Sequence, residues 1–253
     1  MLKTRVIPCL LLQNGRLVKT IKFAKPNYVG DPINIVRIFN TKEVDEVVFL
    51  DISATPEKRG PSFDLIQEIA SECFMPFSYG GGITTLDEVK KLFNLGVEKV
   101  ILNSKAIEDP NFVSEIAKRY GNQSVIISMD VKKNFFGKYQ IYSRCGKLKS
   151  SIDPLTHAVN MEKQGAGEIL LTSIDCDGMM QGYDIQLIKL IAKSVTIPVI
   201  ACGGAGALTD FAEAVNEGGA SAVAAGSMVV YQGKNRAVLT KFPKREELLS
   251  LLP

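Results

Sequence analysis

The sequence predicts a single (β/α)8 barrel over residues 1–253. Short apolar, β-branched runs alternate with amphipathic segments along the chain, a pattern typical of parallel strands connected by helices. The chain has 253 residues, of which 46% are hydrophobic, and one barrel of this kind has a similar length. The two halves of the chain also resemble each other, as two half-barrels of four βα units would.

Eight runs have continuously apolar interiors, as buried parallel strands do. They are Arg5–Leu11, Glu46–Asp51, Pro76–Tyr79, Lys99–Asn103, Val125–Asp130, Glu168–Ser173, Pro198–Cys202 and Ala222–Ala225. Helical periodicity marks segments between them, at Phe63–Ser71, Leu86–Leu95, Phe112–Arg119, Pro154–Gln164, Ile185–Ala192 and Leu208–Glu217. Residues Asp130–Ser150, with aromatic residues around Gly137, predict a β-hairpin inserted after the fifth strand. The segment VKTIKFAKPNYVGDP after the first strand is expected to be a loop.

The internal repeat favours a closed barrel. Residues 75–104 align with residues 197–227, starting at a shift of 122 positions and with one extra residue in the second segment, and residues 45–52 align with residues 167–174 at a shift of 122. A doubly wound sheet is the alternative, but it does not by itself explain a duplication of half the chain.

Composition excludes several classes of function. The net charge is +3 and no long Lys/Arg block occurs, so neither a nucleic-acid partner nor a membrane partner is expected. Five cysteines without a CxxC pair argue against a disulfide framework and a zinc site, and no metal or cofactor is expected. His157 is the only histidine and lies in a helical pattern, so it is interpreted as structural or surface and no Ser-His or Cys-His pair is available. No signal peptide and no apolar run of ~18 residues is recognised, which predicts a cytoplasmic protein.

Glycine and hydroxyl residues follow four of the predicted strands. Barrels bind ligands at the carboxyl ends of their strands, where glycines and helix N-termini present backbone N–H groups to anions. The pattern recurs in both halves, which predicts two phosphate cradles and a substrate with a phosphate at each end. The cradle residues are Gly81, Gly82, Asn103, Ser104, Gly203, Gly204, Gly226 and Ser227. The alternative is that these glycines only form tight turns.

Four aspartates lie at or just beyond strand ends: Asp51, Asp130, Asp175 and Asp177. Asp130 ends the otherwise apolar run SVIISMD, and burying a carboxylate without a role is costly. We therefore assign general acid/base chemistry, or a hydrogen bond to a substrate hydroxyl, to Asp130. Helix capping or loop ion pairs remain the alternative for these aspartates, above all for Asp51 and Asp177.

Charged residues begin four strands at the opposite end of the barrel. Arg5, Glu46, Lys99 and Glu168 alternate in sign, and Glu46 and Glu168 are equivalent in the repeat. They either form a ring across the barrel floor or remain solvated charges with weak salt bridges.

The chain resembles the cyclase subunit of imidazole glycerol phosphate synthase over essentially its full length. The resemblance rests on RVIPCL at the N-terminus, GDP at 30–32, FLDI at 49–52, YGGGI at 79–83, GAGEILLTSID at 165–175, GYD at 182–184 and ACGGAG at 201–206. It implies that a glutaminase subunit docks at the N-terminal face and that ammonia enters through a gate of Arg5, Glu46, Lys99 and Glu168. It also implies that a bisphosphate substrate binds at the top, where Lys19, Asp51, Asp177 and Gly178 join the cradle residues.

Other positions depart from that family. Its acid/base pair consists of two aspartates, and Asp130 matches the second, whereas Leu11 stands at the position of the first. The family's DRDGT reads Asp-Cys-Asp-Gly-Met at 175–179 here, Ser150-Ser151 replaces a Thr-Gly, and Thr20 replaces a glycine. This combination is similar to a branch of paralogues associated with glycosyl amidation in surface-polysaccharide biosynthesis. In that branch a separate sugar amidotransferase uses the ammonia.

Three functions remain open on the sequence. The first is a barrel that channels ammonia for sugar amidation. The second is an active cyclase of histidine biosynthesis, with Asp130 acting alone or with an acid such as Asp51 or Asp177 compensating for Leu11. The third is a scaffold that only activates the glutaminase and binds no phosphate.

Overall fold

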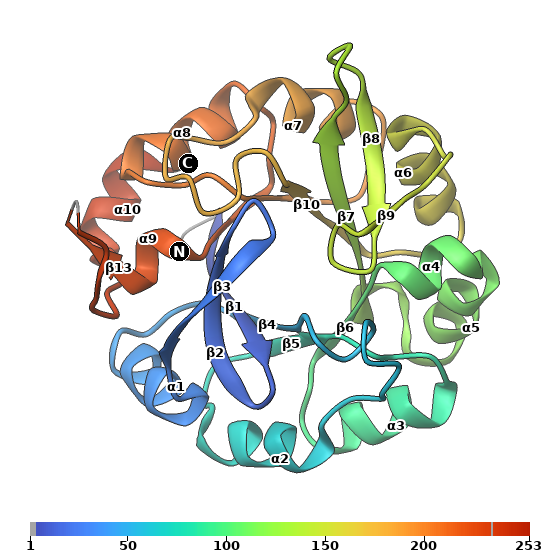
Figure 1. The fold of residues 1–253 in the computed structure, drawn as a ribbon, viewed down its shortest axis with the longest axis horizontal. Coiled ribbons are helices and arrows are strands. Elements are labelled where there is room, and N and C mark those ends of the chain that lie inside the picture. The colour runs from blue at the N-terminus through green and yellow to red at the C-terminus, as the bar shows by residue number, and fades with distance from the viewer. Residues whose placement is uncertain (1–3, 234) are drawn as a thin grey trace.

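Eight parallel strands form a closed barrel at the centre of the computed structural model, which describes residues 4–233 and 235–253 (Figure 1). Neighbouring strands follow the order β10-β11-β12-β1-β4-β5-β6-β7, and pairing between β7 and β10 closes the circle. The strands are β1 (Arg5–Gln13), β4 (Val47–Asp51), β5 (Phe77–Gly80), β6 (Lys99–Leu102), β7 (Val125–Lys133), β10 (Glu168–Ser173), β11 (Val199–Cys202) and β12 (Ala222–Ala225). The predicted (β/α)8 barrel is confirmed.

Helices surround the barrel and connect its strands (Figure 1). They are α1 (Pro32–Thr41), α2 (Phe63–Glu72), α3 (Leu86–Asn94), α4 (Ser104–Glu108), α5 (Pro110–Tyr120), α6 (Pro154–Lys163), α7 (Ile185–Ala192), α8 (Leu208–Asn216), α9 (Ser227–Val230) and α10 (Arg245–Leu251). Local sequence fixes several starts: Asp31 accepts hydrogen bonds at the start of α1, and Thr85 with Glu88 forms a capping box on α3. Among the described residues, no helix has the length and apolarity that crossing a membrane requires.

The sequence repeat corresponds to repeated structure. Shifting α2 (Phe63–Glu72) by 122 positions places its start on that of α7 (Ile185–Ala192), and the same shift relates α3 to α8 and β5 to β11. The short helices α4 and α9 follow β6 and β12 at equivalent points in the two halves. Each half therefore supplies four strands, and equivalent sites lie on opposite sides of the barrel.

Two apolar clusters form the core. The larger one lies between strands and helices, and its biggest fully buried side chains include Phe39, Phe49 and Phe211. The smaller one fills the barrel interior with Ile7, Ile126 and other residues.

His157, the only histidine, is buried in α6. This burial lowers the pKa of its imidazole to about 4, so the side chain is neutral at pH 7.

Three antiparallel additions extend the barrel: β2 (Arg16–Ile21) with β3 (Ala24–Gly30), β8 (Tyr139–Ser143) with β9 (Leu148–Lys149), and β13 (Tyr231–Gln232) with β14 (Ala237–Val238). The expectation of a plain loop after the first strand is wrong. Instead, β1 continues to Gln13, turns at Asn14-Gly15 with positive φ at both residues, and pairs with β2. An Asn-Gly pair between two segments with apolar residues, here ending in Gln13 and beginning with Arg16, is a strong hairpin signal. After the fifth barrel strand, β7 runs beyond the barrel and pairs with β8.

Candidate active-site pocket

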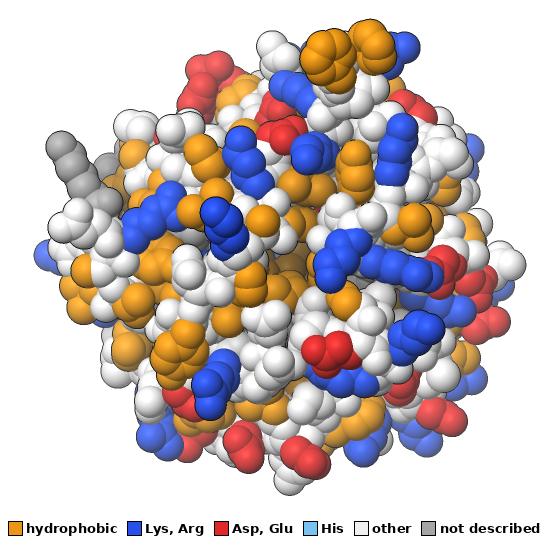
Figure 2. Space-filling model, in the orientation of Figure 1, with side chains coloured by type: hydrophobic (Ala, Val, Ile, Leu, Met, Phe, Trp, Pro, Cys, Tyr) orange, Lys and Arg blue, Asp and Glu red, His pale blue; other side chains and the backbone are white. Residues whose placement is uncertain are grey.

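A pocket opens at the carboxyl ends of the barrel strands (Figure 2). Every barrel strand or the loop after it contributes to its wall. The wall includes each residue that the sequence analysis proposes for acid/base chemistry or phosphate binding: Lys19, Asp51, Gly81, Gly82, Asn103, Ser104, Asp130, Asp177, Gly178, Gly203, Gly204, Gly226 and Ser227. Residues from very different parts of the chain thus converge because the barrel closes.

The two glycine-rich turns face each other across this pocket. One follows β5 and the other follows β11, and these strands lie four positions apart in either direction around the barrel. Gly81 and Gly203 have positive φ angles of 125° and 82°. A Cβ atom would come within 2.5 Å of the Asp51 carbonyl oxygen at Gly81 and within 2.7 Å of the Ser173 carbonyl oxygen at Gly203. Tight packing therefore requires glycine here with or without a ligand, so the phosphate assignment rests on the donors beside these turns.

Hydroxyl groups stand beside both turns. Ser104 and Ser227 are the first residues of α4 and α9, and both line the pocket. The Ser104 hydroxyl oxygen already accepts a hydrogen bond of 3.1 Å from the Arg144 backbone N–H, whereas Ser227 is buried at the other cradle. Arg144 itself lines the pocket, and the sequence analysis did not anticipate this cation. Arg144 lies in the turn between β8 and β9, and only the tertiary structure brings this turn close to the first cradle.

Lys19 brings a buried cation to the second cradle. Its side chain is only 5% exposed, and its ammonium group donates a hydrogen bond to the Cys9 carbonyl oxygen. A side chain at Gly226 would overlap this ammonium group. The glycine therefore lets Lys19 lie against the backbone where β12 ends. A cation in this position suits an anionic ligand group.

Asp130 is the acid at the end of β7. It is 8% exposed; the Asn103 side-chain amide donates a 2.8 Å hydrogen bond to one of its oxygens, and the Ser128 hydroxyl donates a 3.4 Å bond to the other. Burial raises the pKa of this carboxyl to about 7, against the Ser128 hydrogen bond, which lowers it. Near neutral pH, Asp130 is therefore present in both proton-donating and proton-accepting forms.

Asp177 and Asp175 have different surroundings. Asp177 lines the pocket and accepts a 2.9 Å hydrogen bond from the Thr20 hydroxyl, and burial raises its pKa above the usual value. Asp175 instead accepts a 2.9 Å hydrogen bond from the Lys133 backbone N–H at the hairpin, and it is not among the residues of the pocket wall. Of the two, only Asp177 can contact a ligand in the pocket.

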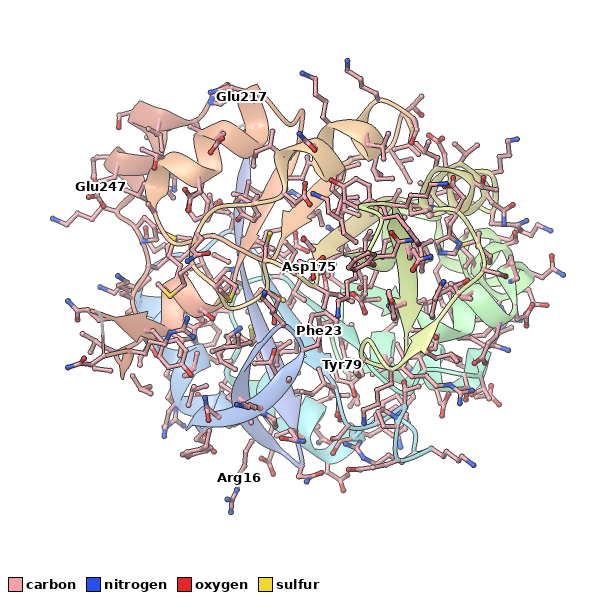
Figure 3. The ribbon with its side chains drawn as sticks, turned by 45° about the horizontal axis from the view of Figure 1, so that its top comes forward. Arg16, Phe23, Tyr79, Asp175, Glu217 and Glu247 are labelled. Carbon is pink, nitrogen blue, oxygen red and sulfur yellow. The ribbon has the colours of Figure 1, made fainter. Side chains whose placement is uncertain are left out.

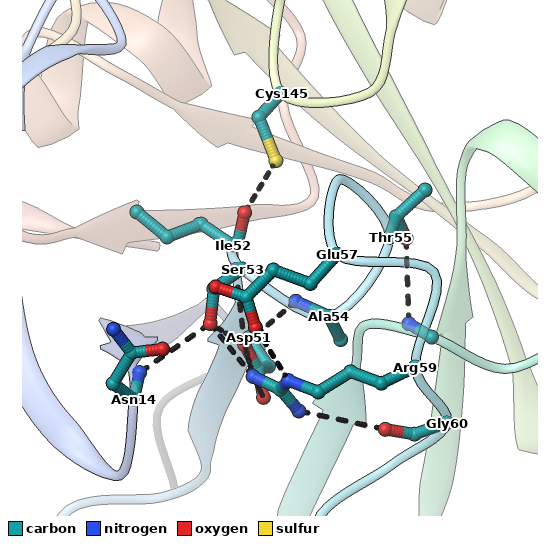
Figure 4. A network of polar contacts seen from close by, with 11 residues as sticks. Asn14, Asp51, Ile52, Ser53, Ala54, Thr55, Glu57, Arg59, Gly60 and Cys145 are labelled. Atoms are coloured by element: carbon teal, nitrogen blue, oxygen red, sulfur yellow. Dashed lines mark hydrogen bonds and ion pairs between the residues drawn. The ribbon is translucent and has the colours of Figure 1, made fainter.

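Asp51 is occupied by its own loop (Figure 4). Its carboxylate lies 2.8 Å from an Arg59 guanidinium nitrogen and accepts hydrogen bonds from the Ser53 hydroxyl and the Ala54 N–H. These bonds hold the turn after β4 in place, and the ion pair neutralises the buried charge. A carboxylate so engaged is poorly suited to accept a proton from a ligand, so Asp51 is a weak substitute for a missing acid.

One side of the pocket is apolar. Leu11 pairs with Leu50 in the register of β1 and β4, and both line the wall together with Phe23. Phe23 stands at the turn between β2 and β3 near the centre of the face (Figure 3). A Cβ atom at Gly146 would lie 3.1 Å from the Phe23 ring, so this hairpin meets the turn between β8 and β9 over the pocket.

At the opposite end of the barrel, the four charged residues that begin strands lie together. Arg5 contacts Glu46 at 2.6 Å and Glu168 at 2.9 Å, and Lys99 contacts the same two carboxylates at 3.3 and 2.9 Å. Each cation bridges both anions, which makes a closed ring across the floor. Their side chains are between 5% and 28% exposed, so water screens these pairs only partly.

The fold and the pocket define a (β/α)8 barrel built from two half-barrels, with a ligand site at the carboxyl ends of its strands. Residues 5–236 match the model of a family described as histidine biosynthesis protein. The chain belongs to this family, and identities of 50% and 47% over 98% of its length to HisF-type relatives place it, within the family, with the cyclase subunits of imidazole glycerol phosphate synthase.

Three relatives illustrate the relationship. The chain is 50% identical over 248 residues to a Pseudomonas aeruginosa protein with the provisional name imidazole glycerol phosphate synthase subunit hisF2, covering 98% of this chain and 99% of the relative. It is 47% identical over 251 residues to a provisionally named HisF subunit of Leptospira interrogans, covering 98% of each chain. It is 42% identical over 231 residues to the imidazole glycerol phosphate synthase subunit HisF of Alkaliphilus metalliredigens, covering 91% of this chain and 92% of the relative.

Proposed function

We propose that this cyclase-like barrel receives glutamine-derived ammonia from a glutaminase docked at its N-terminal face. Ammonia passes the gate formed by Arg5, Glu46, Lys99 and Glu168 and reaches the pocket at the other end. The closed ring supports this role, because one ion pair must open before a molecule can pass. The contact between Lys99 and Glu46, at 3.3 Å, is the longest in the ring and the easiest to open.

The barrel interior suits neutral ammonia. Between the ring and the pocket lie apolar side chains such as Ile7, Val48, Ile126 and Leu170. An ammonium ion in this layer would carry a large desolvation cost, whereas neutral ammonia would not. The same layer keeps bulk water from crossing the barrel.

The ammonia supports amidation of a surface-polysaccharide sugar, with a separate sugar amidotransferase as the enzyme that uses it. The observation that carries this proposal is Leu11. It lines the pocket where the cyclase family has its first aspartate, and a leucine can neither donate nor accept a proton. Loss of one acid/base group typically slows a reaction by about 10²–10⁴-fold. The phosphate cradles, with Lys19 and Ser227, then hold a phosphate-bearing ligand without the cyclase's acid/base pair.

One observation favours an active cyclase as the second candidate. Asp130 has a pKa of about 7, and Asp177 is a second pocket-lining acid with a raised pKa. These two carboxyls would have to replace the usual pair, since Asp51 is held by Arg59.

A cyclase assay tests the proposal. The purified full chain is given the bisphosphate aminoimidazole-carboxamide substrate of histidine biosynthesis with saturating ammonium at high pH, which removes the need for a glutaminase. Absence of turnover by folded, phosphate-binding protein is expected. Turnover near that of an ordinary HisF cyclase would overturn the proposal in favour of the second candidate.

A further inference from the structure

The hairpin formed by β7 and β8 carries two exposed aromatic side chains at its tip. Phe135 is 98% exposed and Phe136 is 83% exposed, and their ring centres lie 5.6 Å apart in an edge-to-face arrangement. The hairpin projects past the ring of helices (Figure 1), and hydrophobic side chains with basic neighbours mark the protruding end in Figure 2. The aromatic pair therefore contributes nothing to the barrel core.

Asn134 makes the tip rigid. Its side-chain oxygen accepts hydrogen bonds from the Phe136 N–H at 2.9 Å and the Lys138 N–H at 3.0 Å. Its carbonyl oxygen accepts from the Gly137 N–H, and its own N–H donates to the Lys138 carbonyl. These backbone groups are satisfied inside the tip, which lowers the cost of moving it into an apolar environment.

The same segment is strongly basic. Between Val131 and Ser150 the chain has five lysines and one arginine but neither Asp nor Glu. The whole chain has a net charge of +3, so the residues outside this segment together carry −3. Lys133 pairs with Asp184 and Arg144 with Glu108, whereas the remaining basic residues of the segment are exposed and form no ion pair within residues 4–233 and 235–253. These are Lys132, Lys138, Lys147 and Lys149.

We infer that the tip of this hairpin docks on an anionic lipid bilayer. Phe135 and Phe136 enter the boundary between headgroups and acyl chains, and Lys132 and Lys138 contact lipid phosphates. Phenylalanine is one of the residues that bury the apolar face of surface-bound segments in this boundary, and each lysine near an anionic surface adds attraction. A small apolar anchor with a basic flank gives reversible attachment to the surface rather than insertion across it.

The geometry favours a bilayer over single-stranded nucleic acid. Proteins that bind bases present aromatic ring faces on which successive bases stack. Here one ring packs its edge against the other, so the pair forms a compact apolar wedge. The inference does not depend on the proposed function, since neither the pocket nor the floor ring takes part.

The sequence predicted no membrane partner because it has neither a membrane-spanning segment nor a long block of basic residues. The hairpin instead brings together charges that are spread over twenty residues of sequence, which neither criterion detects.

A tryptophan reporter tests the inference, because the chain contains no tryptophan. Phe136→Trp in the full chain is mixed with vesicles of phosphatidylcholine containing about one-third phosphatidylglycerol, a composition with a negative surface potential. Tryptophan emission is expected to shift to shorter wavelength and to be quenched by brominated acyl chains. Phe74→Trp is the matched control, since Phe74 is 86% exposed but lies beside the barrel floor, just before β5. It should show neither effect.

Vesicle sedimentation supplies the second measurement. The double variant Phe135→Ser/Phe136→Ser and the double variant Lys132→Ser/Lys138→Ser should each bind the same vesicles at least about tenfold more weakly, and Phe74→Ser should bind like wild type. Binding should fall as salt rises. Equal binding by all variants, an unshifted Phe136→Trp spectrum, or a shift produced by a single-stranded oligonucleotide but not by vesicles would each overturn the inference.

Discussion

Leu11 and Asp130 face each other across the barrel. Leu11 lies on β1 and Asp130 on β7, four strands apart whichever way the barrel is followed, and both line the pocket. An acid at each of these positions could act on opposite faces of a bound substrate. With leucine at one of them, that position can offer a bound ligand only apolar contact.

Leu11→Asp should raise cyclase turnover in the ammonium assay by at least about tenfold, because it restores a carboxyl opposite Asp130. Leu11→Asn is the control, since asparagine has a shape similar to that of aspartate but cannot exchange a proton. Equal rates for the two variants would mean that further differences, such as Thr20 or Met179, also disable cyclisation.

Lys99→Ala should uncouple glutamine hydrolysis from the use of ammonia in the complex with the glutaminase. Removing the ammonium group opens the ring of Arg5, Glu46 and Glu168, so ammonia can escape and water can enter. The measurement is the ratio of glutamate released to ammonia incorporated, which should rise several-fold. Lys90→Ala, an exposed substitution on α3, serves as control. If the Lys99→Ala ratio matched that of the control, the gate assignment would be wrong.

Asp130 should make the free energy of unfolding depend on pH. Its pKa of about 7 in the folded protein exceeds the value of about 3.9 in an unfolded chain, so folding favours the protonated form. This contribution is fully present below about pH 4 and is lost as pH rises through about 7. Asp130→Asn should therefore gain stability relative to wild type at pH 8 more than at pH 5, as measured by urea unfolding. Asp45→Asn, a substitution at an exposed position, is the control. If Asp130→Asn changed stability equally at both pH values, Asp130 would have an ordinary pKa.

Wild-type protein should bind inorganic phosphate, and Ser227→Ala should bind it about three- to tenfold more weakly, as expected for the loss of one hydrogen bond. Calorimetric titration measures both, with Ser221→Ala as an exposed control. A wild-type protein without measurable phosphate affinity would favour the scaffold that only activates a glutaminase.

Much of the fold could be predicted because the spacing of apolar residues indicates the strands and helices, and the repeat of half the chain indicates a closed barrel. The apolar runs at Val199–Cys202 and Ala222–Ala225 are strands within one residue of their expected limits. The predicted helix at Ile185–Ala192 has those same limits. The pairing of β1 with β2 was missed, although Asn14-Gly15 signals it, and so was the hairpin of β2 and β3 that follows. Its role over the pocket could not be predicted, because Phe23 meets Gly146 from more than a hundred residues away.

The sequence by itself determined the alternation of strands and helices, the duplication of half the chain, and which residue types end each strand. These properties follow from side-chain periodicity and backbone preference, which act over a few residues. Only the tertiary structure decided that Asp51 is held by Arg59 while Asp130 remains buried with a raised pKa. It also decided that four charges close a ring across the barrel floor. Ion pairing, burial and electrostatic potential depend on distances between atoms far apart in the chain, and closing the barrel sets those distances.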